Sequence, residues 1–189
     1  MLYATASQTV GPYLHIGLTA LNCADLTADA PDLAAQRIVI AGRVLDGLVQ
    51  PVPDGMVEIW QANPAGRYRH PDDARELPLT AGFTGFGRVP TGPDGAFRFT
   101  TVKPGAVPDG DGRPQAPHIV VSVFTRGLVR HVSTRLYFPE DAAAHRADAV
   151  LARVPADRRA TLVAQADGAE QYRWDVVLQG PGETVFFDI

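Results

Sequence analysis

Tyrosine and histidine side chains, which together can bind a hard metal ion, occur in two of three short candidate segments of the 189-residue chain. The segments are AGRYRHPDD (65–73), VKPGAVPDG (102–110) and RPQAPHIVVS (113–122). Their candidate ligands are Tyr68, His70 and His118. A phenolate oxygen and an imidazole nitrogen suit an iron centre. A histidine at a strand start is nevertheless more often a hydrogen-bonded structural residue, and a tyrosine in a turn a packing residue. Residue type alone therefore leaves both interpretations open.

The rest of the composition excludes several other classes of protein. The only cysteine is Cys23, so an internal disulfide framework and a cysteine-based zinc knuckle are excluded. A formal net charge of -4 argues against a nucleic-acid binder. Because no apolar run is long enough to span a bilayer and the first residues lack the pattern of a secretory signal, we expect a cytoplasmic protein.

The candidate ligands fall in or next to loops, where sites on sandwiches usually lie. Strands are expected to position these loops, because polar and apolar residues alternate with period two along much of the chain. Strands are predicted at 37–46, 56–60, 97–100, 118–124, 132–138, 172–178 and 184–187. An alanine-rich helix is predicted over 141–154, and a second short helix within 24–35. With 18 glycines and 16 prolines to make turns, the chain is predicted to be mainly β: a β-sandwich with one or two short helices and an extended N-terminal arm.

The first 36 residues lack strand periodicity yet carry several apolar side chains, among them Tyr13 and Ile16. We therefore predict that residues 1–36 form an N-terminal arm of the same domain, and that residues 37–189 form the β-sandwich. An exposed arm with this much apolar surface is a liability for a monomer. Two interpretations stay open: the arm packs on its own domain, or it covers a partner chain.

Five segments that run from Ser7 to the C-terminus carry a family resemblance: SQTVGPYLHIGL, VEIWQANPAGRYRH, TVKPGAVPDGDGRPQAPHI, TRLYF and GETVFFDI. In combination they resemble the intradiol ring-cleavage dioxygenases. The iron-bearing chains of that family hold non-haem Fe(III) with two tyrosines and two histidines. In this sequence the four ligand positions fall on Tyr68, Val107, His118 and Val120.

Valine has no lone pair, so Val107 and Val120 remove half of the ligands that the resemblance implies. The family's arginine three residues before the first histidine is also replaced, by Gln115. Since losing even a supporting partner of a ligand typically costs 10–100-fold in metal affinity, we expect no metal in this chain. Tyr68 and His118 are expected to line a closed cleft that the two valines fill. We favour a relic kept for packing over an allosteric pocket.

The resemblance implies instead a non-iron-bearing alpha subunit of a heteromer. Its partner is a homologous beta chain that binds Fe(III), and the pairs assemble into a higher-order alpha-beta oligomer. The implied reaction cleaves 3,4-dihydroxybenzoate with O2 to 3-carboxy-cis,cis-muconate. No catalytic residue is then expected in this chain, which helps to shape the partner's substrate pocket.

The arm is the first segment expected to contact the substrate, because the resemblance places Thr9, Gly11, Pro12 and Tyr13 over the partner's pocket. Gly11 allows close backbone approach, and Pro12 fixes the backbone as a rigid wall for a planar ring.

Arg126 is the second expected contact, because a guanidinium pairs well with the planar carboxylate of the substrate. The competing arginines, Arg130 and Arg135, are expected on a strand, where they face solvent or form a salt bridge.

Two alternatives remain. One is a homomeric intradiol catechol dioxygenase with its own iron, against which the missing ligands argue. The other is a non-catalytic, transthyretin-like β-sandwich binding module. A homologous neighbouring chain that keeps all four ligands supports the heteromer, and its absence favours the module.

Overall fold

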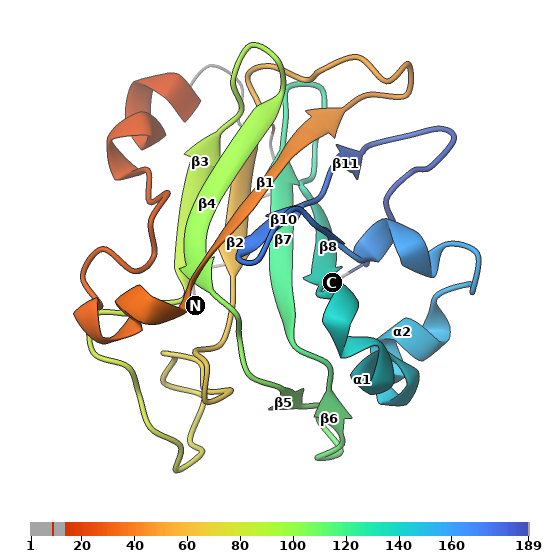
Figure 1. Ribbon diagram of the computed structural model, residues 1–189. Coiled ribbons are helices and arrows are strands. Elements are labelled where there is room, and N and C mark those ends of the chain that lie inside the picture. Colours follow the sequence, from red (N-terminus) through yellow and green to blue (C-terminus); the bar gives the residue numbers. More distant parts are fainter. Residues whose placement is uncertain (1–8, 10–13, 189) are drawn as a thin grey trace, which may run out of the picture.

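The computed structural model describes residue 9 and residues 14–188 of the chain, and its strands form two sheets packed face to face (Figure 1). The first sheet has the order β3-β2-β7-β8 and is antiparallel throughout. Its strands are β3 (Phe86–Pro90), β2 (Met56–Trp60), β7 (His118–Phe124) and β8 (Val132–Tyr137). The β-sandwich prediction is confirmed.

The second sheet is built around β1 (Arg37–Leu45), which pairs antiparallel with β4 (Ala96–Val102). On its other side β1 pairs in parallel with β10 (Gln171–Arg173) and β11 (Val176–Val177), and β9 (Gln165–Ala166) extends the sheet beyond β10. A small hairpin of β5 (Val107–Pro108) and β6 (Pro114–Gln115) lies below both sheets in Figure 1.

The core lies between the sheets because alternate side chains of each strand point inward. One sheet supplies residues such as Ile40, Val44 and Phe99, and the other residues such as Val57 and Ile119. The opposite side chains of β7 and β8 point to the outer face of their sheet, so His118 and Val120 lie on a different surface from the core residue Ile119.

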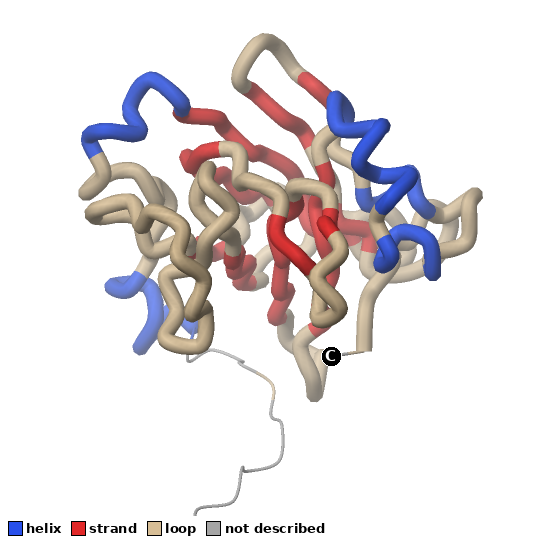
Figure 2. The backbone as a smooth tube through the Cα atoms, turned by 90° about the horizontal axis from the view of Figure 1, so that it is seen from below, coloured by secondary structure: helices blue, strands red, loops and turns tan. Residues whose placement is uncertain are grey.

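Short helices flank the strands (Figure 2). They are the π-helix η1 (Leu14–Leu18), the 3₁₀ helices η2 (Thr19–Leu21), η3 (Pro31–Gln36), η4 (Pro139–Asp141) and η5 (Arg159–Leu162), and the α-helices α1 (Ala142–Ala147) and α2 (Ala149–Arg153). No helix of the described part is long and apolar enough to cross a membrane.

The single helix predicted over 141–154 is wrong, because Asp148 divides it into α1 and α2. Its backbone is extended, and its carboxylate caps α2 by accepting hydrogen bonds from the amides of Val150 (2.8 Å) and Leu151 (3.0 Å). The same carboxylate accepts from the amide of Ala116 at 2.9 Å. Asp148 therefore ties α2 to the segment between β6 and β7.

Other boundaries also differ from the predictions. No strand forms over 184–187, where only Phe187 makes an isolated bridge, to Ser133. The strand predicted over 172–178 is two short strands, β10 and β11, which both pair with β1. Trp174 and Asp175 lie between them, outside the regular pairing. The short helix predicted within 24–35 is η3, which begins only at Pro31.

Part of the predicted arm packs on its own domain. Cys23 forms an isolated antiparallel β-bridge with Arg88 of β3, and Leu26 and Leu33 are buried in the core. The boundary between arm and sandwich at residues 36 and 37 stays a prediction.

Candidate functional site

The loop after β2 places Tyr68 beside Val107. The carbonyl oxygen of Asn63 accepts hydrogen bonds from the amides of Gly66 (2.9 Å) and Gly105 (3.0 Å). Gly66 has a φ of 79°, and a side chain there would place its Cβ 2.3 Å from the carbonyl oxygen of Ala106. Only glycine fits this close approach, which joins the β2 loop to the segment that enters β5.

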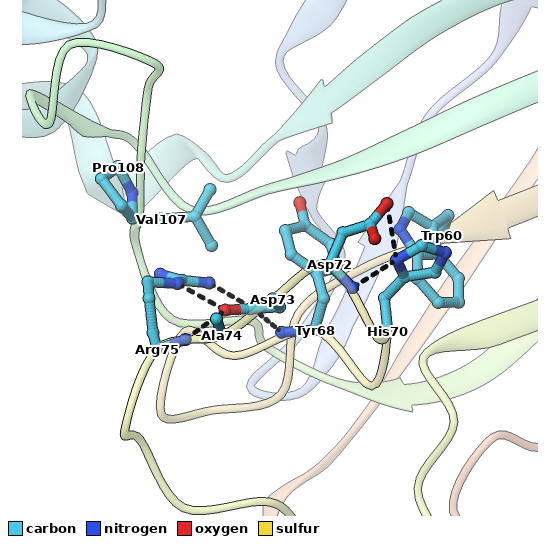
Figure 3. A pocket seen from close by; sticks show the side chains of 9 residues that line it. All are labelled: Trp60, Tyr68, His70, Asp72, Asp73, Ala74, Arg75, Val107 and Pro108. Atoms are coloured by element: carbon cyan, nitrogen blue, oxygen red, sulfur yellow. Dashed lines mark hydrogen bonds and ion pairs between the residues drawn. The ribbon is translucent and has the colours of Figure 1, made fainter.

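An open cavity of about 870 Å³ lies over this junction. Tyr68 stacks on Trp60 within it, with ring centroids 5.7 Å apart and planes 10° from parallel. Figure 3 shows both rings with Val107, which is only 5% exposed, in the lining of the same cavity. Burial raises the pKa of the Tyr68 phenol, so the hydroxyl is protonated at neutral pH.

An ion pair fixes the rim of this cavity. Asp73 accepts hydrogen bonds from Nε (2.8 Å) and Nη2 (2.6 Å) of Arg75, and from the backbone amide of Tyr68 (2.8 Å). The hydrogen bonds from Arg75 hold the pKa of the Asp73 carboxyl well below its usual range. His70 lies at the same cavity, exposed, and its Nδ1 accepts from the amide of Asp72. The Nδ1 atom of His70 is therefore occupied by a hydrogen bond within its own loop.

The other two ligand positions lie on the outer face of β7. His118 is 4% exposed, and its Nδ1–H donates to the carbonyl oxygen of Ala116 at 2.8 Å, since a carbonyl can only accept. Burial lowers the pKa of His118 to about 4, with a further contribution from the charge of Arg135. Val120 lies opposite Arg135 in the ladder between β7 and β8.

Arg135 of β8 contacts the site through uncharged partners. Its Nη1 donates to Oε1 of Gln115 at 2.6 Å and contacts the hydroxyl of Tyr137 at 3.5 Å, and no carboxylate among the described residues pairs with it. Its charge acts on both Tyr68 and His118, and so lies near both. Arg135 lies on a strand, as expected, and is partly exposed, but the expected salt bridge is not formed within the described residues. Gln115, at the position of the family's arginine, supplies the acceptor that holds it.

The four ligand positions do not fit Fe(III). Two of them supply a protonated phenol and an imidazole, the other two supply valine methyl groups, and the guanidinium of Arg135 is a cation held close to them. Within residues 9 and 14–188, no three or more His, Cys, Asp or Glu side chains converge on a metal position. This arrangement binds an anion more readily than a cation.

The two predicted substrate contacts that the structure describes lie at the opposite end of β7. The hydroxyl of Thr9 donates to the carbonyl oxygen of Thr125 at 3.3 Å, directly beside Arg126. The Arg126 side chain is 72% exposed and lies 3.7 Å from the carboxylate of Asp54. Gly11, Pro12 and Tyr13 lie outside the described residues.

The sequence profile of a family described as dioxygenase matches residues 10–180. The chain is 45% identical to the protocatechuate 3,4-dioxygenase alpha chain of Burkholderia cepacia, over 100% of this chain and 98% of that one. It is 38% identical to the beta chain of the same enzyme and organism, over 94% of this chain and 77% of that one. The dioxygenase domain of a Streptomyces dioxygenase–carbohydrate-binding protein fusion shares the fold, with a TM-score of 0.62, 24% identity, and coverage of 85% of this chain and 89% of that one.

Proposed function

The chain belongs to the dioxygenase family, and from this membership we propose that it is the metal-free alpha subunit of a heteromeric protocatechuate 3,4-dioxygenase. Its proposed partner is a homologous beta chain that holds the Fe(III) of this family. The reaction adds both atoms of O2 to 3,4-dihydroxybenzoate and breaks the ring bond between the two hydroxylated carbons, which gives 3-carboxy-cis,cis-muconate. A cytoplasmic location and a higher-order alpha-beta oligomer belong to the same proposal.

The observation that carries the proposal is that valine stands at two metal-ligand positions, and that the cation of Arg135 lies beside one of them. Val107 is buried where the family has a tyrosine, and Val120 faces Arg135 where the family has a histidine. A chain of this kind contributes to the reaction by shaping the partner's pocket. The relatives support this division of labour, since they include separate alpha and beta chains of one enzyme.

The part of this chain proposed to meet the substrate is the arm segment from Thr9 to Tyr13 together with Arg126. The hydrogen bond from Thr9 to Thr125 supports this proposal, because it holds Thr9 beside the loop that carries the exposed cation of Arg126. We propose that Arg126 exchanges its exposed contact with Asp54 for the substrate carboxylate. An exposed ion pair is worth about 0–1 kcal/mol, so this exchange costs little.

Co-expression with a homologous beta chain tests the proposal. Each chain and the complex are purified and assayed for iron, for the visible phenolate-to-Fe(III) absorption band and for oxygen consumption with 3,4-dihydroxybenzoate. We expect iron and the band only where the beta chain is present, and co-purification of the two chains. Stoichiometric iron with that band in this chain alone would instead establish the homomeric dioxygenase, and failure of the chains to associate would favour the binding module.

A further inference from the structure

A second, smaller cavity lies beside Arg135, between the outer face of β7 and β8, helix α2 and the C-terminal segment. Its volume is about 280 Å³. The lining residues are Val120, Ser133, Thr134, Arg135, Val150, Arg153, Phe187 and Asp188. The volume is just below the roughly 300–1,000 Å³ of typical ligand pockets, so the cavity suits only a compact ligand with a single ring.

The charges in this cavity favour an anion. Within the described residues Arg135 contacts Gln115 and Tyr137, both through Nη1, so its other guanidinium donors are available to a ligand. Arg153 comes from the last turn of α2 and, within the described residues, has no carboxylate partner. Asp188 is the only acidic residue among the described residues of the lining, so their two guanidinium groups leave a net positive charge.

The remaining walls favour a ligand with an apolar ring. Val120 and Val150 face the cavity with methyl groups, and Phe187 supplies an aromatic side chain. Its bridge to Ser133 of β8, with an amide-to-carbonyl hydrogen bond of 2.8 Å, holds the C-terminal segment against the sheet. A small inorganic anion would leave these apolar walls unused, whereas the ring of an aromatic acid would bury them.

We propose that this cavity binds a small aromatic monocarboxylate. Its ring lies among Val120, Val150 and Phe187, and its carboxylate is held by Arg135 and Arg153. The binding needs neither iron nor a partner chain, so it goes beyond the function proposed above. In this proposal Val120, which stands at the position of a family metal ligand, forms part of the apolar wall of the binding site.

Benzoate titrated into the purified full chain by isothermal titration calorimetry tests this proposal. We expect one benzoate per chain, and acetate at the same concentration to bind at least tenfold more weakly because it lacks the ring. Arg135→Gln and Arg153→Gln are each expected to weaken benzoate binding about tenfold or more, the loss expected for one charge-assisted hydrogen bond. Val150→Phe is expected to abolish binding by filling the cavity.

Arg146→Gln is the matched control, because Arg146 is an exposed arginine of α1 that does not line the cavity. It should bind benzoate like the wild type. No heat of binding in the folded wild-type chain would overturn the proposal, as would equal binding by wild type, Arg153→Gln and Val150→Phe. Because Arg153 is exposed, its variant keeps the test valid even where Arg135→Gln does not fold.

The outcomes also separate this site from the proposed function. Iron content and oxygen consumption of the alpha-beta complex report the function, and benzoate binding to the isolated chain reports the cavity. Benzoate binding without association with a beta chain would remove the proposed function alone. An active complex whose alpha chain binds no benzoate would remove the cavity proposal alone.

Discussion

The hydroxyl of Thr9 donates a hydrogen bond to the backbone carbonyl oxygen of Thr125, across 116 residues of sequence. The bond holds Thr9 of the arm beside the loop that carries Arg126. Thr9 and Arg126 are both expected to contact the partner's substrate pocket, and their proximity makes it possible to test them together.

Arg126→Ala in the assembled enzyme is expected to raise the KM for 3,4-dihydroxybenzoate by about 10–100-fold. The reason is the loss of a charge-assisted hydrogen bond worth about 1.5–3 kcal/mol. Iron content should not change. Steady-state kinetics and elemental analysis check this, with Arg130→Ala, another exposed arginine of the same loop, as the control. An unchanged KM would remove Arg126 from the pocket.

Thr9→Val is expected to raise the same KM by a smaller factor, about two- to tenfold, because it removes one neutral hydrogen bond of about 0.5–1.5 kcal/mol. Thr9→Ser keeps the hydroxyl and should behave like the wild type. Equal kinetics of the valine and serine variants would mean that the contact with Thr125 does not position the arm.

Asp148→Ala is expected to lower the free energy of unfolding by about 2–4 kcal/mol. The change removes the cap of α2 and leaves the buried amide of Ala116 without its acceptor. Urea denaturation of the purified chain measures the loss. Asp157→Ala, at an exposed turn, is the control and should change stability by less than about 0.5 kcal/mol. A loss no larger than that of the control would contradict this role of Asp148.

Restoring the missing ligands should not restore iron while Arg135 is present. Val107→Tyr combined with Val120→His supplies all four donors, but the nearby guanidinium repels a ferric ion. Adding Arg135→Gln to this pair is expected to raise iron binding by about tenfold or more. Elemental analysis and the visible absorption band measure the gain, with Arg135→Gln alone as the control. Full iron loading of the double variant would show that Arg135 does not oppose the metal.

The pH dependence of stability can be tested at Glu140, which accepts hydrogen bonds from Nζ of Lys103 (2.7 Å) and from the hydroxyl of Tyr172 (2.8 Å). Burial alone would raise the pKa of Glu140, but the hydrogen bonds outweigh it and lower this pKa below its ordinary value. The contribution to stability is therefore present above the unfolded-state pKa of about 4.3, and is lost as pH falls through the folded-state value.

Glu140→Gln should accordingly lower the free energy of unfolding by about 0.5–1 kcal/mol at pH 7, a small effect because the pair is partly exposed. The difference from wild type should shrink toward pH 3. Urea denaturation at the two pH values measures it. A difference of the same size at both values would contradict the assignment to the ionised carboxylate.

The alternation of polar and apolar residues was sufficient to predict the strands that bury one face, such as those around Ile40, Phe99 and Ile119. It missed β3, because Gly87 supplies no side chain to its inner face and Pro90 interrupts the pattern. It also could not divide the helix at Asp148, whose conformation is stabilised by the distant amide of Ala116.

The candidate site was predictable only in part for a similar reason. Matching motifs identified Tyr68, His118 and the two valines, because ligand positions follow local spacing. The orientation of Arg135 depends on the register of β7 against β8 and on an acceptor in β6, neither of which a single segment specifies. The cavity beside it also needs α2 and Phe187, which come from distant parts of the chain.

The hydrogen bond between Gln115 and Arg135 also bears on how such a chain evolves. With the cation held there, a mutation that restores one metal donor gains nothing while the others are missing, and removing the arginine alone leaves valines where donors are needed. No single substitution is therefore expected to improve iron binding, and a stepwise return of the metal site is disfavoured as long as the Gln115–Arg135 pair is kept.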